Sequence, residues 1–155
     1  MTASKMRHPV LLALGILIVV AAVVAVIKRD TIADLILRGG DVTLTEEAAK
    51  SSPQAKLAMD FLAAFRTMDK EAIARYATAE QVARIQQEAQ QPNGDFQKMR
   101  AMMLEDLPAD SAALRDRIKS VQMHGNLAAV WFETKANSWF LQLAQMDGGW
   151  KVSGF

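Results

Sequence analysis

The sequence predicts an α+β domain that follows a single N-terminal transmembrane helix. Three features of the 155-residue chain indicate this architecture. Residues 9–27 form an uninterrupted apolar run, residues 52–107 repeat apolar side chains at helical spacing, and residues 117–155 alternate apolar and polar side chains as strands do. Because the helices come first and the strands last, we expect helices packed on one face of a curved antiparallel sheet.

The composition excludes several classes of function. Charge is balanced, with 18 basic against 17 acidic residues, and a nucleic-acid-binding domain would need a basic face, so we predict no nucleic-acid partner. Cysteine is absent, which excludes disulfides and thiolate chemistry, and the two histidines, His8 and His124, lie far apart in the chain. We therefore predict neither a metal site nor a cofactor.

The apolar run at residues 9–27 contains no charged or strongly polar side chain. At a rise of about 1.5 Å per residue, it spans roughly the 30 Å hydrocarbon core of a bilayer. We predict a transmembrane helix over residues 9–29, preceded by a short tail at residues 1–8. A cleaved signal peptide and a buried soluble helix are the alternatives, but the length of the run and the Lys28-Arg29 pair that follows it favour an anchor.

Basic residues flank the predicted membrane helix on both sides, with Lys5 and Arg7 before it and Lys28-Arg29 after it. A short basic N-terminus before a first hydrophobic segment is usually retained in the cytoplasm. We therefore predict a single-pass protein of the bacterial inner membrane with a periplasmic main domain. Residues 30–51 are predicted to form a stalk or linker, whose second half is either a polar linker or a short helix. Residues 52–155 are predicted to form the folded domain.

Capping signals divide residues 52–107 into four predicted helices. Ser52-Pro53, Asp69 and Thr78 each stand immediately before a helical pattern, and Thr78 has Gln81 three residues later, as in a capping box. Asp95 is predicted to cap the fourth helix. The first helix carries an apolar stripe that predicts a buried face, formed by Leu57, Phe61, Leu62, Phe65 and Met68.

Short turns divide the last part of the chain into four predicted strands, which indicates an antiparallel meander. The strands are residues 117–123, 127–134, 138–146 and 150–155. The second strand is apolar on both faces, so we expect the sheet either to enclose a cavity or to contact another protein. Five large side chains are the candidates for lining such a cavity or interface: Tyr76, Trp131, Phe132, Trp139 and Trp150.

The predicted domain resembles the NTF2-like (cystatin-like cone) superfamily over residues 52–155. Its last strand contains the Gly-Trp-Lys-Val phrase common in that family, and its first helices show the family's rhythm at Phe61, Ala64, Asp69 and Tyr76. The resemblance implies a strongly bent antiparallel sheet wrapped on helices, with a pocket inside. Members include isomerases and dehydratases as well as many non-catalytic binding or assembly domains, so the fold alone does not choose a function.

The sequence favours a non-catalytic function. An isomerase-type site needs a buried carboxylate and a hydrogen-bond donor, for which Asp60 and Tyr76 are the candidates, but Asp60 is expected to face solvent beside Lys56. We therefore predict an accessory or assembly subunit of a membrane complex, in contact with the bilayer and with a partner protein or a second copy of the chain. The alternatives are a small apolar or lipid ligand in the cone pocket and, last, a pocket enzyme.

Overall fold

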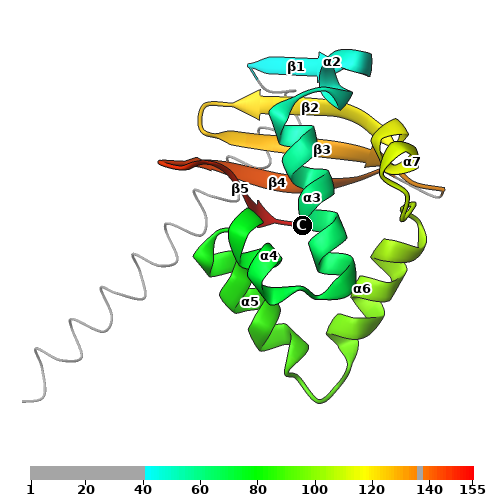
Figure 1. Cartoon of the computed structure of the whole chain (residues 1–155), viewed down its shortest axis with the longest axis vertical. Coiled ribbons are helices and arrows are strands. Elements are labelled where there is room, and N and C mark those ends of the chain that lie inside the picture. Colours follow the sequence, from blue (N-terminus) through cyan, green and yellow to red (C-terminus); the bar gives the residue numbers. More distant parts are fainter. Residues whose placement is uncertain (1–40, 136–137) are drawn as a thin grey trace, which may run out of the picture. The chain divides into compact units, whose positions relative to one another are not determined.

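A computed structural model describes residues 41–135 and 138–155 of the chain. These residues form an α+β unit around a five-stranded antiparallel sheet, with the strands in the order β1-β2-β3-β4-β5 (Figure 1). The strands are β1 Val42–Thr45, β2 Ile118–His124, β3 Leu127–Glu133, β4 Ser138–Met146 and β5 Gly149–Gly154. The predicted α+β class and the antiparallel meander of the last four strands are confirmed.

The predicted transmembrane helix, residues 9–29, lies outside the described residues. Within residues 41–135 and 138–155, no helix is both long enough and apolar enough to cross a bilayer. The membrane anchor therefore stays a prediction from the amino-acid sequence.

The described helices that precede β2 are α2 Glu46–Lys50, α3 Pro53–Thr67, α4 Lys70–Tyr76, α5 Ala79–Ala89, α6 Asp95–Glu105 and α7 Ser111–Asp116. All but α6 contact one face of the sheet, which α3 crosses in Figure 1, whereas α6 packs on α5 and α3. Phe61 and Phe65 of α3 stack with their ring centroids 5.6 Å apart. They belong to one core cluster with the buried strand residues Val130, Leu141 and Val152. Phe61, Leu62 and Phe65 of the predicted stripe are therefore on the buried face of α3. Leu57 is only partly buried, and Met68 lies one residue beyond the helix.

Three predicted helix caps are confirmed at the level of the hydrogen bond. The Ser52 hydroxyl accepts from the Ala55 N–H at 3.1 Å, the Asp69 carboxylate from the Ala72 N–H at 3.0 Å, and the Thr78 hydroxyl from the Gln81 N–H at 3.2 Å. Each bond satisfies one of the backbone donors that a helix leaves free in its first turn. These caps begin α3, α4 and α5 at the positions that the sequence predicted.

Two predicted capping details are wrong. The Thr78 N–H donates to the carbonyl of Val152 at 2.8 Å, so Gln81 does not complete a capping box. Gln81 is buried instead, and its Nε2 has no hydrogen-bond partner. At the start of α6, Gly94 rather than Asp95 is the N-cap residue, because the chain there takes a φ of 69°, which glycine adopts without steric cost.

The folded unit begins earlier in the chain than the sequence predicted. Residues 42–50, which were predicted to be a polar linker or a short helix, form β1 and the short helix α2. Val42 pairs with Met123 of β2, and Ala49 of α2 is fully buried in the core cluster. A four-residue strand is too short to be recognised by its alternation, and its hydrogen-bond partner lies far along the chain. The helix α7 was not predicted, although Asp110 caps it by accepting from the Ala113 N–H at 2.8 Å.

Register shifts decide which face of the sheet the closing residues occupy. Gln142 pairs with Gly154 and Leu143 pairs with Val152, so Ser153 is an extra residue in β5. A bulge of this kind reverses the alternation of side chains beyond it. Phe155 consequently lies on the core side, where its ring centroid is 5.2 Å from that of Phe65.

Two arginines join the C-terminal ends of α3 and α6. Arg66 of α3 donates to the carbonyls of Leu107 at 3.0 Å and Pro108 at 3.2 Å. Arg100 of α6 donates to the carbonyls of Phe65, at 3.1 Å, and of Arg66. The guanidinium group of Arg100 suits its position because the last carbonyls of α3 lack the usual intrahelical partners and carry the negative end of the helix dipole, whereas Arg66 binds carbonyls just beyond the end of α6. The reciprocal contacts fix α6 against α3.

Candidate functional site

The sheet has a face that none of the described helices covers. On β3, Val130 and Phe132 belong to the core cluster, so Ala129 and Trp131 project to the opposite side. Each described helix that contacts the sheet contributes a residue to this one cluster, and therefore packs on the core side. We name the opposite side the outer face and define it by its central residues Ser120, Gln122, Ala129, Trp131, Phe140, Gln142 and Ala144.

An aromatic pair stands at the centre of the outer face. Trp131 of β3 and Phe140 of β4 are directly paired across the strands, with ring centroids 4.7 Å apart and 37° between the ring planes. The indole N–H of Trp131 donates to the Gln122 side-chain oxygen at 3.2 Å. Both rings are partly exposed and stand apart from the core cluster. The pair is held in place by its own cross-strand contacts and by β2.

Small and neutral side chains surround this pair. Ala129 is fully buried, yet it is not part of the core cluster, and its cross-strand neighbours are Gln122 and Gln142. The centre of the outer face thus combines two aromatic rings with amide side chains over a small residue. The centres of protein–protein contact surfaces are typically enriched in aromatic residues and depleted in charge. This composition fits a contact with another protein.

The five candidate residues do not lie together. Trp131 is on the outer face, whereas Phe132 is fully buried on the core side with its ring 5.7 Å from that of Trp139. Tyr76, Trp139 and Trp150 are partly buried against the core cluster. Phe132 cannot contact a partner directly because none of its surface is exposed. Phe140, which sequence reasoning did not select, is the aromatic residue that accompanies Trp131.

Asp60, the carboxylate considered for catalysis, is in contact with solvent. The Lys56 ammonium donates to the Asp60 carboxylate at 2.7 Å, and this hydrogen bond raises the pKa of Lys56. The Asp60 side chain is 36% exposed, so it is not the buried base that an isomerase-type site needs. His124 Nδ1 lies 3.1 Å from the Asp41 carboxylate in an exposed pair. In the part of the chain that the structure describes, no three His, Cys, Asp or Glu side chains gather as metal ligands.

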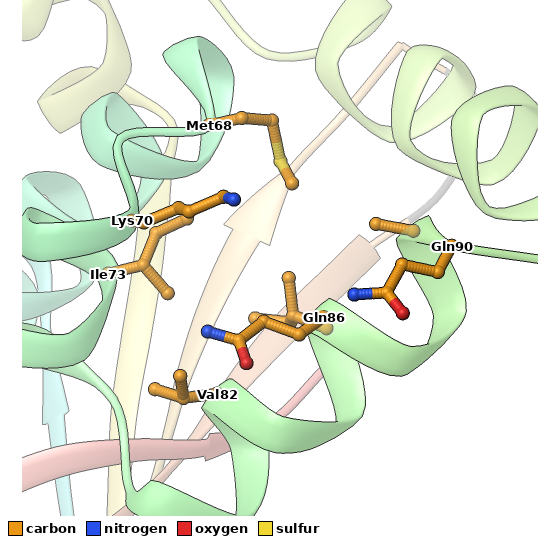
Figure 2. Close-up of a pocket in the computed structure, with 8 residues that line it drawn as sticks. Met68, Lys70, Ile73, Val82, Gln86 and Gln90 are labelled. Atoms are coloured by element: carbon orange, nitrogen blue, oxygen red, sulfur yellow. The ribbon is translucent and has the colours of Figure 1, made fainter.

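Two hollows open among the helices, away from the outer face. One has a volume of about 350 Å³ and lies between the end of α3, α4 and α5 (Figure 2). The other has a volume of about 260 Å³ and lies between α3 and the segment that leads into α7. None of the five candidate residues lines either hollow. The described geometry therefore gives no support to a ligand site built from the tryptophans.

Comparison with known proteins gives no match, whether by family model, by curated sequence or by solved structure. The resemblance to the NTF2-like superfamily stays a prediction from the sequence.

Proposed function

We propose that this chain is a membrane-anchored, non-catalytic assembly subunit whose outer face binds another protein component of a membrane complex. The observation that carries the proposal is the Trp131–Phe140 pair, which is aromatic, partly exposed and without helical cover among the described residues. We also propose that the domain is NTF2-like, which the order of helices followed by an antiparallel meander supports. The periplasmic location and the anchor are parts of the same proposal and rest on the apolar run at residues 9–27 and the basic residues that flank it.

The chemistry of the outer face favours a protein as the partner. Aromatic rings supply a large apolar area, and the indole N–H and the nearby amides supply directional hydrogen bonds. The central residues of the face carry no charge, which matches the desolvated centre of a stable interface better than a surface for a charged ligand. The exposed Lys56–Asp60 pair supports a non-catalytic role.

The test compares two charge substitutions in the full-length protein. Phe140→Asp places a carboxylate at the centre of the outer face, whereas Met102→Asp places one on α6 at a methionine that is 68% exposed. Each protein is expressed in its native membrane, extracted in mild detergent, and its mass is measured under native conditions. We expect a stoichiometric complex with wild type and with Met102→Asp, and its loss with Phe140→Asp.

Circular dichroism of each purified variant checks that the domain is folded before the masses are compared. A wild-type protein that is monomeric after extraction contradicts an assembly role. A complex that survives Phe140→Asp contradicts the outer face as the contact surface, and equal loss in both variants means that the substitutions do not report on that face.

A further inference from the structure

The hollow between α4 and α5 has an apolar floor. Ile73 of α4 and Ile85 of α5 are buried at its base, and Val82 and Ala89 continue the apolar lining along α5. Its volume of about 350 Å³ lies within the range of sites that bind small organic molecules, which is roughly 300–1,000 Å³. The hollow is therefore large enough for a ligand with an apolar portion.

An ammonium group and two side-chain amides stand at the rim of this hollow. Figure 2 shows the Lys70 ammonium and the side-chain amides of Gln86 and Gln90 directed into the space between the two helices. No acidic residue is part of the lining. The rim thus offers a positive charge and amide donors, and a negatively charged head group is the chemistry that complements it.

Met68 completes the wall at the end of α3. Its backbone has φ 55° and ψ 36°, the left-handed conformation that helix ends usually give to glycine. A side chain in this conformation is disfavoured, so a methionine here carries a cost that glycine would not. Unlike glycine, the methionine supplies a long and adaptable side chain, which extends from the end of α3 toward the hollow (Figure 2).

We propose that this hollow binds a single-chain carboxylate amphiphile, that is, a medium-chain fatty acid. The tail lies on Ile73, Val82 and Ile85, and the carboxylate accepts from Lys70 and the rim amides. The volume of about 350 Å³ corresponds to roughly ten groups of the size of a water molecule in the liquid, about 30 Å³ each, and this sets an upper limit of about ten carbon atoms on the tail. This site is separate from the outer face, and the inference does not rest on the proposed assembly role.

An acyl chain fits the lining better than an apolar peptide does. The lining residues come from α4, α5 and the end of α3, where the backbone N–H and C=O groups are largely used within the helices. A bound peptide would bring amides that find few partners on the apolar floor, and burying unpaired amides is unfavourable. A fatty acid has no polar group in its tail, and its carboxylate head lies at the rim, where the polar partners are.

The test is photolabelling of the full-length chain in phosphatidylcholine nanodiscs with decanoate that carries a diazirine near the end of its tail. After irradiation, mass spectrometry of proteolytic peptides locates the label. We expect labelling of the peptides that contain α4 and α5, competition by unmodified decanoate, and much weaker competition by decyltrimethylammonium, which has the same tail and the opposite charge. A peptide that ends in apolar residues is a second competitor, expected to have no effect.

Four variants assign the label to the hollow. Ala89→Phe fills it and should reduce labelling of the α4 and α5 peptides at least tenfold. Met68→Gly removes the wall at a position whose backbone suits glycine, so the fold is retained and labelling falls. Lys70→Gln should reduce labelling about two- to fivefold, as expected for the loss of one exposed charge pair. Lys119→Gln, an exposed lysine on β2 outside the lining, should leave labelling unchanged.

Several results would overturn the proposal. Labelling confined to the predicted membrane segment, or undiminished in both Ala89→Phe and Met68→Gly, would show that the hollow is not a site. Equal competition by decyltrimethylammonium would contradict the assignment of a carboxylate head. If the apolar peptide reduced labelling and unmodified decanoate did not, the ligand of the hollow would be a peptide and not a fatty acid.

Discussion

The core face and the outer face of the sheet are formed by alternate residues of the same strands. Helices cover the core face, whereas none of the described helices covers the outer face. Phe132 and Trp131 are neighbours in β3, but Phe132 is 0% exposed beneath the helices, whereas Trp131 packs on Phe140 and is held by Gln122. The comparison teaches that an aromatic residue in a strand contributes to the core only on the side that helices cover. On the other side it forms a surface.

The largest expected effect is on the core face. Phe132→Ala removes a fully buried ring that also contacts Trp139, and we expect the free energy of unfolding to fall by about 3–5 kcal/mol. Urea unfolding followed by tryptophan fluorescence measures it, because all three tryptophans lie in the folded unit. Phe140→Ala is the matched control on the outer face and should cost less than half as much. If both variants lost the same free energy of unfolding, the two faces would not differ in how much their aromatic residues stabilise the fold.

A double-mutant cycle on Trp131 and Phe140 sharpens the comparison on the outer face. Each alanine substitution should lower the free energy of unfolding by about 1–2 kcal/mol, and the coupling between them should be about 0.5–1.5 kcal/mol because the rings contact each other directly. The same urea titration, applied to wild type, both single variants and the double variant, gives the coupling. Strict additivity would mean that the two rings do not support each other.

The smallest expected effect concerns a buried amide on the helical side. The Nε2 of Gln81 is buried without a partner, so Gln81→Met, which keeps the shape and removes the amide, should raise the free energy of unfolding by up to about 1 kcal/mol. Gln87→Met, on an exposed position of the same helix, is the control and should change little because the two residues have similar helix propensities. A clear loss of stability in Gln81→Met would indicate that the amide has a partner, such as a bound water.

Local chemistry made much of the helical half predictable. The side chains of Ser52, Asp69 and Thr78 each accept a hydrogen bond from the backbone N–H three residues later. The start of each helix can therefore be predicted from a few consecutive residues. The same reasoning failed for β1, whose four residues are stabilised by β2 and α2 rather than by their own pattern. It also placed Asp95 at a cap that Gly94 occupies.

The candidate site was predictable only in part. The apolar residues on both faces of β3 pointed to Trp131, but the choice of Phe140 as its companion requires the register between β3 and β4, which no local pattern contains. Phe132 was selected for its size, and its burial depends on helices that are remote in sequence. The hollow beside α5 depends on the left-handed backbone of Met68, which a methionine at a helix end does not indicate.

The two outermost strands of the sheet have different free edges. The backbone of β5 is engaged on its far side, where Ala77 forms a parallel bridge with Val152 and the Thr78 N–H donates to the Val152 carbonyl. In the described part of the chain, β1 pairs only with β2. Polymerisation by strand addition needs two open edges on each molecule, because a sheet with one open edge stops growing once two copies have joined. The turn between α4 and α5 therefore occupies the β5 edge at Val152 and opposes strand addition there.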